Sequence, residues 1–276
     1  MSGSLIEVKE LTRIYRSKAV GRKKEFPFVG TTSTEINALS SITFNIDKGE
    51  RVALVGPNGS GKTTLIKLLS GLLQPTSGDI RVTNLTPFTQ RRQLNLKIAS
   101  FFGGKSYLWH GVSVLDNLKL QKSVYKIPTD VFNTSLEEWV QILDIRDLLH
   151  RKTESLSLGQ TLKCELILKL VHDPDVIFLD EPTNGLDIEA KQTLRAYLKK
   201  ISQSKNKTLV ITSHDMGDID YLCDRILILD RGNLLQDSSV KELKNLHLKT
   251  KKTIEIETPL EQVILQIYRN LRTKND

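Results

Sequence analysis

Residues 56 to 63 have the types and the spacing of a phosphate-binding loop. The segment consists of Gly56, Pro57, Asn58, Gly59, Ser60, Gly61, Lys62 and Thr63. Its glycines allow several backbone N–H groups to converge on phosphate oxygens, and a helix that begins directly afterwards adds its positive end. We expect Lys62 to reach the β- and γ-phosphates of a nucleotide and Thr63 to bind Mg²⁺ through its hydroxyl.

Two adjacent carboxylates, Asp180 and Glu181, follow an apolar run at Val176–Leu179. Such a run predicts a buried strand, which would bring both carboxylates to the sheet edge where α/β proteins bind ligands. One carboxylate can enter the shell of a metal ion, and a second can polarise an attacking water. Because the pair follows the phosphate-binding loop along the chain, we expect Asp180 to bind the metal and Glu181 to act as the base in a hydrolysis.

Strand and helix patterns surround both segments. Apolar or alternating runs predict strands within 5–15, 38–55 and 97–102, and Lys62–Leu69 predicts a helix. Further strands and helices are predicted in alternation at Val176–Leu179, Glu189–Ile201, Thr208–Thr212, Met216–Leu222 and Arg225–Leu229. This alternation is typical of βα units on a parallel sheet. Residues 112–172 show helical periodicity without strand signals, so we expect a helical insertion there.

Turn-forming residues predict the exposed connections. Residues 17–36 are first basic and then rich in Gly, Thr and Ser, and Gly71, Pro75 and Gly78 punctuate a second segment. We expect both segments to be loops. The C-terminal segment predicts a strand, a turn at Pro259 and a short amphipathic helix that closes the fold.

Composition narrows the class of protein. The chain has 276 residues, 39% hydrophobic and 26% charged, which is typical of a folded globular protein and excludes wholesale disorder. No apolar run approaches the roughly 18 residues of a membrane-spanning helix, and charges occupy the N-terminal positions that a signal peptide keeps apolar. Cys164 and Cys223 lack the spacing of metal ligands, so we expect reduced thiols.

The net charge of +8 allows nucleic acid, an anionic membrane surface or a plain solvated surface as explanations. The basic cluster within 16–24 has no interleaved aromatic residues, which binding by base stacking would require. We therefore expect no nucleic-acid partner.

Five motifs in this order resemble those of the nucleotide-binding subunit of the ATP-binding cassette (ABC) family. Besides the phosphate-binding loop and the acidic pair, Leu156–Gln160 looks like the family signature, with Leu158 in place of a glycine. Asn184–Asp187 is similar to the D-loop, and Thr212–Asp215 is similar to the switch-histidine segment. The resemblance covers about residues 5–237.

The resemblance implies an α/β fold. Its P-loop NTPase core has a mixed sheet, with an antiparallel β-subdomain at the N-terminal side and a helical subdomain inserted at about 105–172. Residues 1–237 would form the ABC ATPase domain, and residues 238–276 a short C-terminal extension.

The resemblance also implies residue roles in an ATPase that uses ATP and Mg²⁺. Two subunits pair head to tail, so that Ser157 and Gly159 contact the γ-phosphate held by the other subunit's loop, and Gln160 is a further nucleotide-binding residue of this signature. His214 would sense the γ-phosphate, although a histidine by itself is more often a satisfied buried side chain. Tyr15 would stack on adenine, although by itself it would be ordinary strand packing. Nucleotide contacts extend to Thr64, directly after the loop.

Finer features are similar to ABC subunits that drive exporters of drugs, peptides, lipids or polymers through separate permeases. These features are Phe102, Gly103, Leu108, Trp109, the run from Lys163 to Leu166 and the run from Leu260 to Tyr268. The resemblance implies a peripheral subunit at the cytoplasmic face of the membrane, bound to permease subunits and to a second ATPase, either this chain or a paralogue. An importer ATPase and a non-transport ABC ATPase remain the alternatives. Residues near Gly103 and from Tyr107 to Trp109 are candidates for the permease-facing groove, unless Leu108 and Trp109 are core.

One position departs from the family pattern. The family usually ends the strand near residue 102 with a glutamine that contacts Mg²⁺ and the attacking water, whereas this chain has Gly104. Slow turnover, a neighbour such as Lys105, a bridging water or a sister subunit that supplies the glutamine would each account for the difference. We expect Gly104→Gln to leave ATP binding intact and to raise hydrolysis in the assembled complex.

Overall fold

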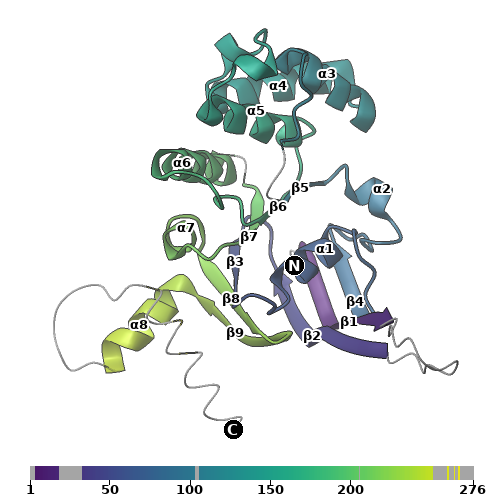
Figure 1. Cartoon of the computed structure of the whole chain (residues 1–276), viewed down its shortest axis with the longest axis vertical. Coiled ribbons are helices and arrows are strands. Elements are labelled where there is room, and N and C mark those ends of the chain that lie inside the picture. The colour runs from purple at the N-terminus through teal and green to yellow at the C-terminus, as the bar shows by residue number, and fades with distance from the viewer. Residues whose placement is uncertain are drawn as a thin grey trace, which may run out of the picture.

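The computed structural model describes residues 4–18, 33–102, 106–204 and 206–250, together with Leu260, Ile264 and Ile267. Two sheets organise these residues (Figure 1). A six-stranded mixed sheet has the order β5-β6-β7-β3-β8-β9, in which only the β8–β9 pair is antiparallel. A three-stranded antiparallel sheet has the order β2-β1-β4.

The strands of the six-stranded sheet are β5 (Ile98–Phe102), β6 (Val176–Asp180), β7 (Thr208–Thr212), β3 (Arg51–Val55), β8 (Arg225–Asp230) and β9 (Asn233–Ser239). Every residue of β6 and β7 is buried, as expected for parallel strands covered on both faces. Those of the antiparallel sheet are β1 (Ile6–Lys18), β2 (Ser33–Ile46) and β4 (Ser77–Val82).

Helices cover the six-stranded sheet on both faces. The helices are α1 (Lys62–Leu69), α2 (Arg91–Leu94), α3 (Val114–Tyr125), α4 (Thr129–Leu143), α5 (Leu158–Leu170), α6 (Ile188–Ser204), α7 (Met216–Leu222) and α8 (Val240–Thr250). Helices α3, α4 and α5 form a separate cluster above the sheet in Figure 1. Two short 3₁₀ turns, Arg146–Leu148 and Thr153–Ser155, connect α4 to α5.

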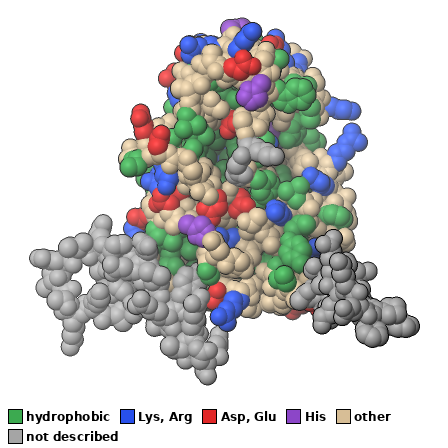
Figure 2. Space-filling model, viewed as in Figure 1, with side chains coloured by type: hydrophobic (Ala, Val, Ile, Leu, Met, Phe, Trp, Pro, Cys, Tyr) green, Lys and Arg blue, Asp and Glu red, His purple; other side chains and the backbone are tan. Residues whose placement is uncertain are grey.

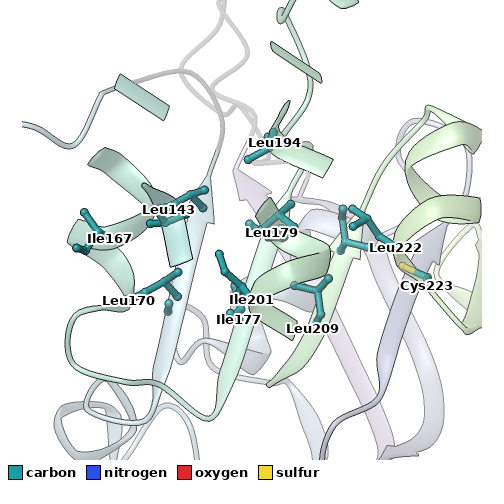
Figure 3. Packing of buried hydrophobic residues seen from close by; sticks show 14 of the residues in the cluster. Leu143, Ile167, Leu170, Ile177, Leu179, Leu194, Ile201, Leu209, Leu222 and Cys223 are labelled. Carbon is teal, nitrogen blue, oxygen red and sulfur yellow. The ribbon is translucent and has the colours of Figure 1, made fainter. Parts of the chain in front are cut away.

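Alternate residues of the parallel strands point into two different cores. Ile177, Leu179 and Leu209 belong to a first core that also contains residues of α4 to α7, part of which is drawn in Figure 3. Val176 and Phe178 belong to a second core, together with α1 and the antiparallel sheet. This arrangement confirms the predicted α/β fold with a mixed sheet, an antiparallel sheet built from N-terminal strands and helices inserted between β5 and β6.

Several local predictions were wrong. Strand β4 occupies part of the segment around Gly78 that we expected to be a loop, because β1 supplies its backbone partners while its side chains alternate between buried and exposed. The predicted loop 17–36 begins and ends within β1 and β2, which pair as far as Lys18 and Ser33. The rest of that loop lies outside the described residues.

Elements with polar sequences were not predicted from their patterns. The edge strand β9 carries polar residues and, among the described strands, pairs only with β8, and α2 has four residues. At the C-terminus, α8 follows β9 directly, and Leu260 and Ile264 are helical and buried in the first core, as expected of a helix that closes the fold. The strand and the Pro259 turn predicted before them lie outside the described residues. Among the described residues, no helix combines the length and the apolar character that crossing a bilayer requires.

Candidate nucleotide-binding site

The loop between β3 and α1 has the backbone that its glycines predict. Gly59 and Gly61 have φ values of +80° and +105°, in the left-handed region that favours glycine. A Cβ on Gly61 would lie 2.5 Å from the carbonyl oxygen of Ala38, and one on Gly56 would lie 2.3 Å from that of Leu229. No side chain caps the start of α1, so its first N–H groups are available to an anion.

Lys62 lies beneath this loop. Its Nζ donates hydrogen bonds to the carbonyl oxygens of Gly56 (2.7 Å) and Pro57 (3.1 Å), and only 6% of the residue is exposed. Burial lowers the pKa of Lys62 because it penalises the charged ammonium, and the nearby carboxylates of Glu181 and Asp180 oppose that shift. The ammonium is thus held by two loop carbonyls at the place where phosphate oxygens are expected.

Asp180 joins three segments at the carboxyl end of the sheet. Its Oδ1 accepts hydrogen bonds from Thr63 Oγ1 (3.2 Å) and from Thr212 Oγ1 (2.7 Å). The phosphate-binding loop and the acidic strand, 117 residues apart, therefore converge as predicted. We did not predict the Thr212 contact, although a threonine ending the strand next to β6 is the signal that could have indicated it.

The oxygens of Thr63 and Asp180 fit Mg²⁺, which prefers hard oxygen ligands and shares its shell with waters and substrate phosphates. No cluster of three or more His, Cys, Asp or Glu side chains suited to a metal occurs in the part of the chain that the structure describes. The donor set therefore fits a metal that needs phosphate oxygens to complete its shell, and not a self-contained metal site.

Glu181 and His214 meet at the same edge. His214 Nε2 lies 3.1 Å from Glu181 Oε1, and half of the His214 side chain is exposed, so this histidine is not a buried core residue. Glu181 has a φ of +52°, an uncommon conformation for a residue other than glycine. Its N–H donates to Thr212 Oγ1 (2.9 Å) and to the Thr212 carbonyl oxygen (3.1 Å), which hold it there.

The predicted signature residues begin α5. Ser157 is the N-cap and forms a capping box with Gln160: Ser157 Oγ accepts from Gln160 N (3.3 Å), and Gln160 Oε1 accepts from Ser157 N (3.0 Å). Gly159 has open space around the position of a Cβ, and Leu158 is 53% exposed. Leu158 lines a cavity together with Asp180 and Glu181, but among the hydrogen bonds of the described residues none joins Ser157, Gly159 or Gln160 to the phosphate-binding loop of the same chain.

Tyr15 lies beside the start of α1. Its hydroxyl is 3.5 Å from Thr64 Oγ1, directly after the phosphate-binding loop, and the Arg13 guanidinium lies 4.7 Å from the centre of its ring. Tyr15 is therefore near the loop, as expected, and Arg13 covers part of the ring.

The positions around Gly104 are only partly described. Gly103, Gly104 and Lys105 lie outside the described residues, so their predicted roles remain predictions. The Tyr107 hydroxyl accepts from Phe102 N (3.0 Å) and donates to Phe102 O (2.9 Å), which joins the two ends of this segment. Leu108 is buried, which agrees with the alternative that it is a core residue. Trp109 is 66% exposed and is therefore not a core residue.

Comparisons with known proteins identify the family. The family model described as "ABC transporter" matches residues 39–184. The energy-coupling factor transporter ATP-binding protein EcfA1 of Mycoplasmopsis synoviae is 31% identical, over 87% of this chain and 88% of its own length. The ABC transporter ATP-binding protein NatA of Bacillus subtilis is 29% identical, over 75% and 84% of the two chains. The methionine import ATP-binding protein MetN 1 of Bacillus cereus is 28% identical, over 91% and 70%.

Solved structures agree with this family. The structure of cbiO1 from Clostridium perfringens, part of the ABC transporter complex cbiONQ, has a TM-score of 0.71 and 25% identity and covers 89% of this chain and 95% of its own. The bacterial ABC transporter cassette MJ0796, solved as a dimer, has a TM-score of 0.64 and 25% identity and covers 85% and 98%. This chain belongs to the ABC transporter family as an ATP-binding subunit, and it is an enzyme that hydrolyses ATP.

Proposed function

We propose that this chain hydrolyses ATP in a site shared by two subunits and thereby drives transport through a separate membrane permease. The observation that carries the proposal is the convergence of the phosphate-binding loop, Asp180, Glu181 and His214 at one sheet edge. Thr63 of the loop lies 3.2 Å from Asp180, Thr212 lies 2.7 Å from the same Asp180 oxygen, and His214 lies 3.1 Å from Glu181. These are the groups that binding and hydrolysing a nucleoside triphosphate require.

Each residue at this edge has a proposed role. The loop N–H groups and Lys62 bind the β- and γ-phosphates, and Lys62 exchanges its two carbonyl partners for phosphate oxygens. Thr63 and Asp180 would hold Mg²⁺, which offsets phosphate charge when it is bound. Glu181 takes a proton from the attacking water, and His214 contacts the γ-phosphate while Glu181 Oε1 orients its ring. Tyr15 stacks on adenine next to Thr64.

We propose that the site is completed by a second subunit. Ser157, Gly159 and Gln160 begin α5, which packs in a different core from α1, and among the hydrogen bonds of the described residues none joins them to the phosphate-binding loop of the same chain. Their exposed N-terminal helix end suits the phosphate of a partner held head to tail, and the similar cassette MJ0796 is dimeric. The partner is a second copy of this chain or a paralogue.

The helical segment is proposed to transmit the motion to the permease. A cavity of about 310 Å³ separates Leu158 and Glu165 of α5 from Asp180 and Glu181, which leaves room for the helices to shift relative to the sheet. Hydrophobic side chains reach the surface over this helical cluster (Figure 2), and Trp109, which is exposed, follows residues 103–105 in the sequence. The proposed domains are the ATPase domain at 1–237, which includes the helical subdomain at 105–172, and the C-terminal extension at 238–276. The proposed location of the assembly is the cytoplasmic face of the membrane.

The direction of transport has two candidates. Export rests on the resemblance around Phe102, Gly103 and Trp109 and on the absence of the glutamine at position 104. Import is favoured at least as well by the relatives, which include proteins named for methionine import and, at 27% identity, for spermidine and putrescine import. Both candidates use the same ATPase chemistry, so the geometry of the site supports them equally.

The test is to isolate the assembly and to measure its transport. The tagged chain, extracted from its native membranes in mild detergent, is expected to retain one or two polytopic permeases, identified by mass spectrometry. A secreted binding protein in the same complex would favour import over export. The complex reconstituted in vesicles should move its substrate only with ATP, and Glu181→Gln should stop transport. Recovery of ribosomal proteins or DNA alone would contradict the transport proposal and leave the ATPase assignment intact.

A further inference from the structure

We infer that Asp218 is a positioning residue for ATP hydrolysis, because its carboxylate ties the segment that carries Glu181 to the segment that carries His214. The inference rests on the roles proposed above for those two residues. Asp218 lies in the first turn of α7, and nothing in the phosphate-binding loop contacts it among the hydrogen bonds of the described residues.

The Asp218 carboxylate is fully buried, and it has three side-chain partners. Its Oδ2 accepts hydrogen bonds from Thr183 Oγ1 (2.5 Å) and Ser213 Oγ (2.7 Å), and its Oδ1 accepts one from Arg195 Nε (2.5 Å). A buried carboxylate requires this kind of pairing, since an unpaired charge in the interior is strongly unfavourable. One oxygen atom thereby joins the chain after β6 to the chain after β7.

The Thr183 contact acts on Glu181. Glu181 holds a left-handed backbone conformation, which persists at a residue other than glycine only when its surroundings fix it. On its N-terminal side, the Glu181 N–H is bound to Thr212. On its C-terminal side, Thr183, two residues after Glu181, is bound to Asp218. Thr212 and Asp218 thus hold the chain on both sides of the proposed base, and we call this arrangement the clamp.

The Ser213 contact acts on His214. Ser213 precedes the histidine and donates to Asp218, while Asp215 follows it and donates its N–H to Ser213 Oγ (3.0 Å). Arg195 binds both acids, because its second nitrogen lies 2.9 Å from Asp215 Oδ2. Both neighbours of His214 are therefore fixed to the same buried charge pair.

This arrangement predicts a loss of rate without a loss of ATP affinity. Most groups assigned to phosphate binding lie in the loop and in α1, with His214 as one further γ-phosphate contact, whereas the Thr183 and Ser213 hydroxyls donate to Asp218. A displaced Glu181 or His214 would still allow ATP to bind but would misalign the attacking water.

The experiment removes single hydroxyls from the full chain, because Asp218→Asn alone risks unfolding. Thr183→Val and Ser213→Ala should each lower kcat at least tenfold, while the Kd for a fluorescent ATP analogue stays within twofold of the wild type. Thr183→Ser, which restores the hydroxyl, should recover kcat to within threefold. Asp220→Asn, an exposed carboxylate of the same helix paired with Lys244, is the matched control and should leave both constants unchanged.

Three results would overturn the inference. One is a Thr183→Val variant with kcat within twofold of the wild type. The second is an ATP affinity that falls in step with kcat, and the third is a Thr183→Ser variant that recovers no activity. Both of these indicate a general packing role. Glu181→Gln is measured in parallel. Unchanged hydrolysis in that variant would contradict the proposed role of Glu181 itself. If Glu181→Gln is inactive, as expected, the Thr183 and Ser213 variants decide whether Asp218 positions the two residues.

Discussion

His214 Nε2 lies 3.1 Å from Glu181 Oε1, although 32 residues of the chain separate the strand ends that carry them. The contact follows from the topology, since β6 and β7 are adjacent parallel strands and both residues come just after the carboxyl ends. The proposed base therefore has His214 as a polar partner, and in the proposed function the histidine exchanges this carboxylate for a γ-phosphate oxygen.

Glu181→Gln should abolish most hydrolysis while ATP still binds. The amide keeps the size of the side chain and can still accept a hydrogen bond from His214, but it cannot take a proton from water. Loss of a general base costs about 10²- to 10⁴-fold in rate. Steady-state hydrolysis and binding of a fluorescent ATP analogue measure the two properties. Glu137→Gln, in the exposed ion pair with Arg146, is the control, and equal rates for the two variants would contradict the assignment.

Gly61→Ala should be far more destabilising than Gly59→Ala. Both positions have positive φ, which costs about 1 kcal/mol for alanine. At Gly61 the new Cβ would also lie 2.5 Å from the Ala38 carbonyl oxygen, whereas at Gly59 it would have no neighbour within 4 Å. We expect a total loss of about 2 to 5 kcal/mol for Gly61→Ala. Denaturant unfolding of the two variants measures the difference, and equal midpoints would contradict the predicted clash.

The parts of the site that the sequence predicted are contiguous motifs. Gly56 to Thr63 and the run that ends in Asp180 and Glu181 carry their chemistry in neighbouring residues, so spacing alone indicates their role. Strand β4 escaped prediction because its partner, β1, is about 70 residues away, and the alternation of exposed and buried side chains in β4 is confined to Asp79–Val82, too short to stand out in the sequence.

The contacts that hold the site in place were not predictable. Thr183 and Asp218 are 35 residues apart, and a threonine and an aspartate are common in any loop or helix. They form a hydrogen bond only because the fold brings the first turn of α7 next to the segment that follows β6. The same holds for Thr212 and Asp180, which belong to neighbouring strands.

His172 should make the protein less stable in mild acid. Burial lowers the pKa of His172 to about 4, its Nε2 lies 3.0 Å from the Ile98 carbonyl oxygen, and its ring stacks on Tyr125 with centroids 4.3 Å apart. The unfolded chain, with an ordinary histidine pKa, binds a proton between about pH 6.5 and 4, while the folded chain does not. Stability therefore falls as the pH falls through this window, by about 2 kcal/mol at pH 5.

The measurement is the melting temperature at pH 7.5 and pH 5 for the wild type and for His172→Gln, which keeps a donor toward Ile98 but does not titrate. The variant should lose about 4 to 8 °C less than the wild type on acidification. His110→Gln, at an exposed position, is the control. An identical drop in the wild type and in His172→Gln would show that other groups cause the acid sensitivity.

Ser157→Ala and Ser113→Ala should separate the structural role of a helix cap from its role in catalysis. Each serine is the N-cap of a helix in the same cluster, where its Oγ accepts a hydrogen bond from the N–H three residues later. Removing either cap should cost about 1 kcal/mol, or about 2 to 4 °C in melting temperature.

Only Ser157 is proposed to contact the γ-phosphate of a partner subunit. Hydrolysis by the full chain should therefore fall at least tenfold in Ser157→Ala and stay within twofold in Ser113→Ala. ATP-dependent dimerisation, followed by size-exclusion chromatography in a Glu181→Gln background, should weaken only in the Ser157 variant. If the two variants lose activity equally, the stability of the helical cluster and not a contact across the dimer explains the effect.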